Sequence, residues 1–505
     1  MIIKSVQTLH PSLFAKVDWF SIGEPGEIAF IPGRWYNLLI DGERKHFRYR
    51  GSGMSVTIVG GGISGLSLAY FLLGKDPGLE IRVLEAENRP GGKICSDSTE
   101  GFLCERGVNG FLDNKPLTLE LAERLSLNPL RSNEAAKKRF IYSRGKLYPL
   151  PESPQAFLLS GLLSPCGRGR IFCEVLSPGG KEEDETLASF AKRRLGREAY
   201  EKLIDPMASG IYAGDPEKLS LKSCFPRIHE LEKEYGSLIK ALLKLQKKAK
   251  KSGKSVGPGP GGTLTSFYDG METIVRSLRE FLGQRLLVSK RVKSIDKSEE
   301  RYTLYLEDGS VMESDTVILA CPAYAASEIL RDFDPALAAH LSEIPYPAVS
   351  VACLGFRQED IRHNVNGFGF LVPASEKRKI LGTLWDSSIF PNRAPEGYVL
   401  LRSMIGGARA SELAMEDEER ETGIVLDELK DIMGIDVSPD FVRVYRHEKA
   451  IPQYNVGHAA RLQEIDKAVS GYRGLYLTGN AYRGIGVNDC IENSCNMAGK
   501  LYSKT

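Results

Sequence analysis

The sequence predicts an α/β fold, and three observations lead to this prediction. A β-branched run at residues 56–59 meets a cluster of glycines, and a helical apolar pattern follows over residues 63–73. A second strand is predicted at residues 80–85, which completes a strand–turn–helix–strand unit. Near the end of the chain, a strand at residues 474–480 ends in glycine and precedes the final helix at residues 490–502.

The first turn has the glycine spacing of a dinucleotide-binding unit, because Gly60, Gly62 and Gly65 match the pattern G-x-G-x-x-G. Gly60 allows the turn, Gly62 lets the backbone approach a pyrophosphate, and Gly65 lets the helix pack closely on the strand. The phosphates would then lie at the helix N-terminus, where free N–H groups and the helix dipole favour anions. The glycines alone are a weak signal, since such turns also occur without a ligand.

Glu85 and the segment after it extend this prediction. Glu85 lies about 20 residues after the last glycine, where an acid can bind ribose hydroxyls. An ordinary acid at a strand end is the alternative. Gly91 and Gly92 permit a second close approach of the backbone to a cofactor, and Lys93 offers a positive charge near phosphate.

The composition sets broad limits on the class of protein. A chain of 505 residues with a net charge of +2 suggests two or three domains and gives no reason to expect nucleic acid as a partner. Nine cysteines without a C-x-x-C pair suggest reduced thiols in a cytosolic compartment, and no metal site is predicted. No uninterrupted apolar run approaches the roughly 18 residues of a membrane span, so we expect any membrane contact to be peripheral.

Residues 1–53 differ from the rest of the chain. They show neither the pattern of a signal peptide nor the acid-poor composition of a transit peptide. We expect an extension of little catalytic importance that lies upstream of the natural start, with the organised fold beginning at Met54.

The middle of the chain alternates between helical and α/β segments. Residues 150–250 are mostly helical, with an amphipathic helix over residues 231–251 and an irregular turn at residues 209–215. A stretch rich in glycine, proline and lysine at residues 250–262 marks a flexible boundary. The predicted elements that follow are a helix at 271–282, a strand at 286–295, a hairpin at 302–306 and 311 onward, a buried strand at 315–322, and a second domain over 323–440.

Together these segments resemble the oxygen-dependent protoporphyrinogen oxidase family, within the flavin superfamily that includes monoamine oxidases and carotene desaturases. The resemblance covers residues 54–503. Beyond the glycine motif and Glu85, it rests on the Arg89–Lys93 segment, the segment Gly479–Val487, and three more specific stretches, Ser209–Asp215, Ile451–His458 and Gly484–Ile491.

The resemblance implies bound FAD. The residues it implies for the cofactor are Gly60, Gly61, Gly62, Ile63, Ser64, Gly65, Glu85, Ala86, Lys93, Gly107, Val108, Asn109, Gly110, Val292, His447, Ile485, Gly486 and Val487. Two of them depart from the family pattern. Val108 stands where relatives usually have proline, which affects turn rigidity. His447 stands where many relatives have tryptophan, and we expect no catalytic role for it.

The resemblance also implies an α/β FAD-binding domain of Rossmann-like, amine-oxidase type, an α+β substrate domain and a helical membrane-docking region. The expected ranges are 54–140, 263–330 and 441–505 for the FAD-binding domain, 141–262 for the helical membrane-docking and substrate region, and 331–440 for the substrate-binding domain. We expect a cytoplasmic protein with peripheral membrane contact, and a homodimer is left open.

The reaction implied is oxidation of protoporphyrinogen IX to protoporphyrin IX, with dioxygen as the electron acceptor and flavin N5 taking hydride from a methine-bridge carbon. No side chain is nominated as catalytic, because the cofactor carries the chemistry. The resemblance assigns Arg139 to a substrate propionate, Gly210 to space for the ring, and Leu371 and Phe390 to apolar walls. A solvated charge is the alternative for Arg139, and ordinary core is the alternative for Phe390.

Two alternative functions remain open at the level of sequence. The first is coproporphyrinogen III oxidation to coproporphyrin III, because that substrate carries four carboxylates and the sequence does not place the basic residues that would bind them. The second is a non-enzymatic binder, like the prenyl-GTPase dissociation inhibitors that share the nucleotide fold without flavin. The complete glycine set argues against the second alternative.

Overall fold

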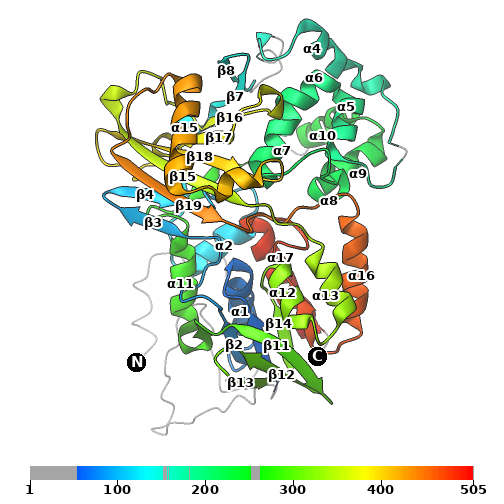
Figure 1. Cartoon of the computed structure of the whole chain (residues 1–505). Helices are drawn as coiled ribbons and strands as arrows, with labels where there is room; N and C mark the ends of the chain where they lie inside the picture. The colour runs from blue at the N-terminus through cyan, green and yellow to red at the C-terminus, as the bar shows by residue number, and fades with distance from the viewer. Residues whose placement is uncertain (1–53, 152–155, 157–158, 181, 252–261, 504–505) are drawn as a thin grey trace, which may run out of the picture. The chain divides into compact units, whose positions relative to one another are not determined.

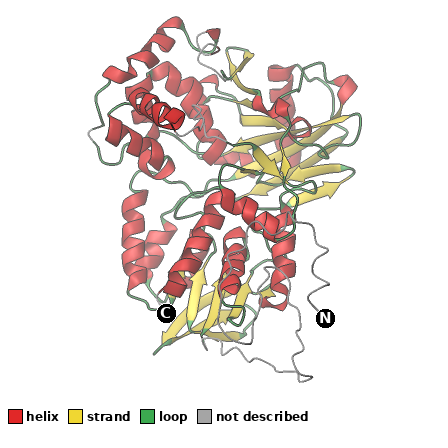
Figure 2. Ribbon diagram, turned by 180° about the vertical axis from the view of Figure 1, so that it is seen from behind, coloured by secondary structure: helices red, strands yellow, loops and turns green. Residues whose placement is uncertain are grey.

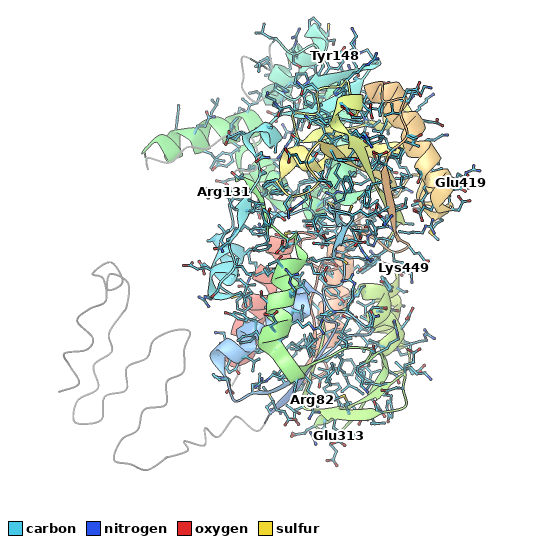
Figure 3. All side chains as sticks on the ribbon, turned by 90° about the vertical axis from the view of Figure 1, so that its left-hand side faces the viewer. Arg82, Arg131, Tyr148, Glu313, Glu419 and Lys449 are labelled. Carbon is cyan, nitrogen blue, oxygen red and sulfur yellow. The ribbon has the colours of Figure 1, made fainter. Side chains whose placement is uncertain are left out.

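The computed structural model describes residues 54–151, 156, 159–180, 182–251 and 262–503. The expected extension at residues 1–53 and most of the predicted boundary at residues 250–262 lie outside the described residues. In Figure 3, Arg82 and Glu313 lie at one end of the described chain and Tyr148 lies at the other end.

A five-stranded parallel sheet forms the first layer, in the order β10-β2-β1-β14-β20. Its strands are β1 (Ser55–Val59), β2 (Glu80–Leu84), β10 (Leu286–Leu287), β14 (Thr316–Leu319) and β20 (Leu475–Leu477). The predicted strand–turn–helix–strand unit is confirmed, because α1 (Ile63–Lys75) connects β1 to the parallel strand β2.

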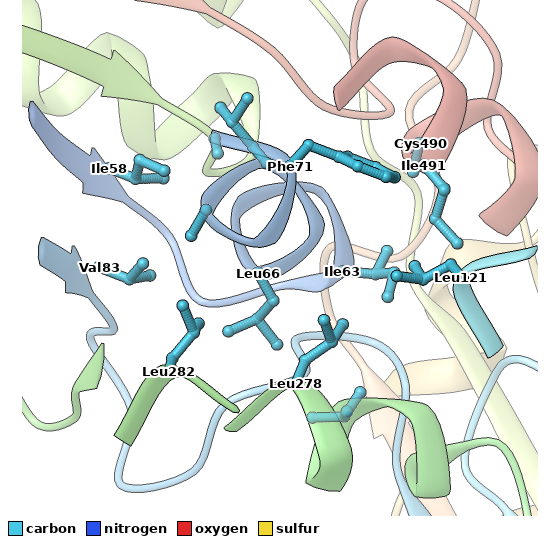
Figure 4. Packing of buried hydrophobic residues seen from close by; sticks show 14 of the residues in the cluster. Ile58, Ile63, Leu66, Phe71, Val83, Leu121, Leu278, Leu282, Cys490 and Ile491 are labelled. Atoms are coloured by element: carbon cyan, nitrogen blue, oxygen red, sulfur yellow. The ribbon is translucent and has the colours of Figure 1, made fainter. Parts of the chain in front are cut away.

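Helices cover both faces of this sheet. On one face, α1, α11 (Glu272–Leu282) and α17 (Val487–Ser503) bury apolar side chains against Ile58, Val83 and Ile318. Figure 4 shows Leu66 and Leu278 in this cluster, together with Cys490 and Ile491 of α17. On the other face, α12 (Ala323–Leu330), α13 (Pro335–Ser342) and α16 (His458–Ser470) lie together with a three-stranded sheet over residues 292–314. The strands are therefore buried on both sides, as is usual for parallel sheets.

The strand predicted at residues 286–295 is wrong as a single element. Leu286 pairs with Val83 in the parallel sheet, whereas Val292 pairs with Leu306 in a separate three-stranded sheet. That sheet is formed by β11 (Val292–Ser298), β12 (Arg301–Leu306) and β13 (Val311–Ser314), so the predicted hairpin is confirmed. The chain leaves one sheet for another between the two pairings, which a local apolar pattern does not reveal.

A seven-stranded sheet forms the second layer, in the order β19-β15-β18-β17-β16-β7-β8. Its strands are β7 (Arg139–Ser143), β8 (Lys146–Pro149), β15 (Val349–Arg357), β16 (Gly369–Leu371), β17 (Ile380–Trp385), β18 (Tyr398–Gly406) and β19 (Phe441–His447). Helix α15 (Glu418–Met433) packs on one face through Val425 and Leu429. The expected domain boundary at residue 441 is too early for this sheet, since β19 pairs with β15 along its whole length.

The helical region lies beside the seven-stranded sheet in Figure 1, and Figure 2 shows it as a group of helices. Its helices include α4 (Pro165–Phe172), α5 (Leu187–Leu195), α7 (Asp205–Tyr212), α8 (Leu221–Cys224), α9 (Pro226–Tyr235) and α10 (Leu238–Lys251). The single helix predicted over residues 231–251 is wrong, because Gly236 ends α9 in the left-handed conformation. The irregular turn predicted at 209–215 is largely the last turn of α7, which ends at left-handed Ala213.

Candidate active site

A cavity of about 980 Å³ lies at the carboxyl ends of the parallel strands. In open α/β sheets this is the edge where ligands bind. Its walls also include the end of β19, so both sheets contribute to it. Of the residues implied for the cofactor, those that line it are Gly60, Gly62, Ile63, Ser64, Glu85, Ala86, Lys93, Val108, Val292, His447, Ile485 and Val487.

The three motif glycines occupy different environments. Gly60 has φ +115°, and a Cβ there would lie 2.9 Å from the backbone of Ala320. A Cβ at Gly65 would overlap the carbonyl oxygen of Gly60, so this glycine permits the close packing of helix on strand. A Cβ at Gly62, by contrast, would meet no atom within 4 Å. Gly62 precedes α1 without a side-chain cap, so the free helix N-terminus faces open space.

Glu85 is fixed by the backbone around the turn. Its Oε2 accepts a hydrogen bond of 2.8 Å from the N–H of Gly61, and its Oε1 accepts one of 2.9 Å from Glu87. Each oxygen retains a further lone pair, and Glu85 lines the cavity. A fixed acceptor at this place suits the ribose hydroxyls of a dinucleotide.

The Arg89–Lys93 segment forms another part of the wall. The N–H of Gly91 donates to the carbonyl of Gly61 at 2.8 Å, which joins the two glycine turns. The Arg89 guanidinium donates to the carbonyls of Gly92 and Ile94. These hydrogen bonds fix the backbone conformation of the segment. Lys93 lines the cavity, where the surrounding protein lowers the pKa of its ammonium group by desolvation.

His447 lies at the end of β19 on the cavity wall. Its Nε2 lies 2.8 Å from the carbonyl oxygen of Arg106, so Nε2 carries the proton and donates. Desolvation lowers the pKa of this imidazole, which keeps it neutral. Val108 also lines the cavity, and a Cβ at Gly107 would lie 3.7 Å from the His447 Nε2. The two departures from the family pattern are therefore near neighbours.

Six implied cofactor residues are absent from the cavity wall, namely Gly61, Gly65, Gly107, Asn109, Gly110 and Gly486. Most of them shape the wall from behind. Asn109 is different, because both polar atoms of its side chain are buried without a hydrogen-bond partner among the described residues. Such an amide fits a polar ligand that is bound next to Val108.

The sequence prediction missed the loop after β14. Cys321, Pro322 and Tyr324 line the cavity there, and the start of this loop lies beside the glycine turn, since a Cβ at Gly60 would lie 2.9 Å from the N of Cys321. The proline that stops a buried strand was a usable signal. The pairing of β14 with β1, which brings this loop to the cavity, was not visible in the sequence.

The residues assigned to substrate lie on two neighbouring elements. Arg139 is exposed, with its guanidinium 4.9 Å from the centre of the Phe368 ring. Arg139 of β7 is the register partner of Gly369 of β16. The half-buried Leu371 lies two residues after Gly369 on β16. A Cβ at Gly210 on α7 would lie 2.9 Å from Leu371 Cδ2, so this helix and the sheet approach closely there.

Phe390 requires a correction. It is 1% exposed and packs with Ala136 and Ile389 beneath Phe368 and Leu384. The Arg393 guanidinium lies 5.0 Å from the centre of its ring. The structure therefore places Phe390 in the core, with almost no surface to offer a substrate.

One face of the seven-stranded sheet carries both substrate residues and His447 of the cavity wall. Cross-strand partners and residues two apart on a strand point to the same face. The registers therefore place a continuous series on the face opposite α15, formed by Arg139, Gly369, Leu371, Gly382, Met404, Val351, Val349 and His447. His447 lines the cavity at one end of this series, and Arg139 is exposed at the other.

A parallel sheet with this glycine turn, acid and cavity defines a dinucleotide-binding fold of the flavoprotein type. The chain belongs to the flavin-containing amine oxidoreductase family, whose model matches residues 63–501. The cofactor is FAD, and the open space before Gly62, the fixed Glu85 and the unpartnered Asn109 fit it.

Three relatives illustrate the similarity. The chain is 32% identical over 452 residues to coproporphyrinogen III oxidase of Bacillus subtilis, which covers 86% of this chain and 95% of the relative. It is 34% identical over 469 residues to the chloroplastic protoporphyrinogen oxidase of Nicotiana tabacum, with 89% and 85% covered. A crystal structure of an Exiguobacterium sp. 255-15 protein superposes with a TM-score of 0.77 at 28% identity, with 90% and 100% covered.

Proposed function

We propose that the protein is an FAD-dependent oxidase that converts protoporphyrinogen IX to protoporphyrin IX with dioxygen as electron acceptor. The observation that carries this proposal is the flavin-type cavity, with His447 on its wall and the exposed Arg139 on the same face of the seven-stranded sheet. Such a cation suits a mostly apolar substrate with an acidic edge. The similarity to oxidases of this kind supports the same substrate class.

Arg139 suits a propionate because it is exposed and forms no ion pair with any described residue. The Phe368 ring beneath the guanidinium restricts its motion and leaves its N–H groups outward. The planar guanidinium can donate two parallel hydrogen bonds to one carboxylate. We therefore assign Arg139 to orientation of the substrate.

Gly210 and Leu371 are assigned to the fit of the macrocycle. Gly210 is exposed, and its lack of a side chain lets α7 approach Leu371 closely, since a Cβ there would lie 2.9 Å from Leu371 Cδ2. Leu371 offers apolar surface two residues from the Arg139 pairing. These residues bind and orient the substrate, and FAD when bound supplies the two-electron acceptance that the oxidation requires.

The proposed division of the chain follows the sheets. The FAD-binding domain comprises residues 54–138, 263–344 and 448–503, and the substrate-binding domain comprises residues 139–149 and 345–447. The helical region at 159–251 packs against the substrate sheet. The ion pair of Arg409 with Asp205 of α7 supports that arrangement, since it joins the end of β18 to the helical region.

Coproporphyrinogen III is the second candidate substrate, because a relative of that name covers most of this chain. The non-enzymatic alternative is disfavoured by membership of an oxidoreductase family. Parallel turnover of the two porphyrinogens, followed by porphyrin fluorescence, tests the choice. Faster oxidation of protoporphyrinogen supports the main proposal, faster oxidation of coproporphyrinogen favours the second, and no oxidation of either contradicts both.

We also propose reversible contact with a membrane surface through α10. No helix in the described part of the chain is long and apolar enough to cross a bilayer. Leu243 of α10 is 54% exposed, and Lys240, Lys244 and Lys247 are exposed on the same helix. An amphipathic helix with apolar and basic side chains can bind an anionic interface.

A further inference from the structure

The segment Ile451–His458 lies outside the cavity wall, yet it is fastened to the helical region at several points. The Gln453 side chain donates through Nε2 to the carbonyl of Tyr212, the last residue of α7, at 2.9 Å. The carbonyl of Tyr454 accepts a hydrogen bond of 2.8 Å from the N–H of Ser220. The N–H of Gly457 donates to Asp184 Oδ2 at 2.9 Å.

The same segment reaches the wall of the flavin cavity through the side chain of Tyr454. The hydroxyl of Tyr454 donates a short hydrogen bond to the backbone carbonyl of Asn480. Gly479 and Asn480 line the cavity, and so do Ile485 and Val487 further along the connection from β20 to α17. Among the described residues, Tyr454 is the hydrogen-bond donor to the Asn480 carbonyl.

Burial and stacking fix the position of the Tyr454 ring beside this loop. It is 1% exposed and stacks on the His458 imidazole, with 4.2 Å between ring centres and 12° between ring planes. Burial raises the pKa of the phenol, so the hydroxyl remains a donor throughout the physiological range. The adjacent backbone is fixed by Ser220, as described above.

We propose that Tyr454 is a positioning residue for FAD, whose hydroxyl fixes the Gly479–Asn480 wall from outside the cavity. A carbonyl that loses its buried donor must find another partner or remain unsatisfied, which costs free energy and frees the loop to move. Residues that hold a cofactor indirectly in this way commonly decide its orientation. The proposal concerns the flavin site alone and holds for either porphyrinogen.

The test compares Tyr454→Phe with Tyr212→Phe in the full-length protein. Tyr212 is a matched control because it is also buried, at 4% exposed, and its hydroxyl donates to the carbonyl of Cys224 at 3.1 Å, away from the cavity wall. FAD is removed and titrated back while its fluorescence is followed. The visible flavin spectrum and amide hydrogen exchange of residues 478–486 are recorded on each holoprotein.

We expect Tyr454→Phe to raise the FAD dissociation constant about tenfold, with a shifted flavin spectrum and faster exchange over residues 478–486. Tyr212→Phe should leave all three measurements near those of the unmodified protein. Equal effects of the two substitutions, or no effect of Tyr454→Phe, would overturn the proposal. A Tyr454→Phe protein that does not fold while Tyr212→Phe folds would also overturn it, since Tyr454 would then serve the core.

Discussion

The N–H of Gly61 donates to the carboxylate of Glu85 at 2.8 Å and ties the glycine turn to the end of the neighbouring strand. The turn and the acid were predicted from separate sequence signals, and the hydrogen bond makes them one rigid wall. Gly62 stands next to this wall with open space before it. The arrangement leads directly to a test of the cofactor site.

Substitution Gly62→Val should abolish FAD binding without unfolding the protein. The backbone at Gly62 has φ −72°, which valine adopts, and a Cβ there meets no protein atom within 4 Å. The added side chain would occupy the space expected for the pyrophosphate. Flavin absorbance and circular dichroism of the purified protein check this.

The matched control is Gly74→Val, since Gly74 lies near the other end of α1, with equally open surroundings but away from the cavity. It should retain flavin. Full flavin content in folded Gly62→Val protein would contradict the assignment of the pyrophosphate site to this turn.

Substitution Arg139→Ala should lower kcat/KM for a porphyrinogen by roughly 10- to 100-fold, because a charge-assisted hydrogen bond contributes about 1.5–3 kcal/mol. Flavin content and thermal stability should remain near normal, since Arg139 is exposed and contacts only the Phe368 ring among the described interactions. Steady-state kinetics with the free acid and with a propionate ester measure the effect.

The loss should shrink for the ester, because the ester lacks the anionic partner. Lys138→Ala, at the adjacent exposed position, is the control and should change kcat/KM little. Equal impairment of Arg139→Ala on acid and ester would show that Arg139 supports the fold or the flavin.

His458 should make the protein less stable in mild acid. Desolvation, and more weakly Arg461 and Arg483, lower the pKa of His458 from 6.5 to about 4, although a hydrogen bond with the Tyr482 backbone and the charge of Asp184 oppose them. The unfolded chain therefore binds a proton that the folded protein excludes. This difference does not reduce the free energy of unfolding above pH 6.5. The free energy of unfolding decreases as the pH falls from 6.5 towards 4, by about 2 kcal/mol near pH 5.

Substitution His458→Phe should remove this contribution, because phenylalanine can keep the stack on Tyr454 and does not titrate. The melting temperature should then fall less between neutral and mildly acidic pH than in the unmodified protein. The same pH dependence in both proteins would assign the acid sensitivity to other groups.

A chain that starts at Met54 should fold, bind FAD and turn over normally. The first strand of the parallel sheet begins at Ser55, and the family match begins at residue 63. Expression yield, flavin content and melting temperature of this shortened protein can be compared with those of the full chain. A large loss in any of them would show that residues 1–53 are part of the domain.

Substitution Leu243→Asp should weaken binding to anionic vesicles about tenfold, since burial of a leucine side chain contributes roughly 1.5–3 kcal/mol. Val311→Asp is the control, because Val311 is 55% exposed on β13, far along the chain from α10. Flotation with anionic vesicles at low salt measures binding. Absence of binding by the unmodified protein would contradict the proposed membrane contact.

Local sequence signals are sufficient to predict the cofactor turn. Gly60, Gly62, Gly65 and Glu85 act over short separations, where spacing alone fixes which backbone conformations are available. The predicted strand–turn–helix–strand unit and the hairpin over residues 302–314 are confirmed for the same reason. The resemblance added the cofactor and the family, which the match over residues 63–501 confirms.

The surroundings of that turn depend on contacts between distant parts of the chain. The pairing of Val56 with Thr316 brings the loop after β14 to the cavity across a long stretch of chain, and local patterns carry no information on such partners. Strand register placed His447 and Arg139 on one sheet face, since a shift of one residue would have turned either side chain to the opposite face. Packing decided that Phe390 is core, because burial depends on every neighbouring element and not on the residue type.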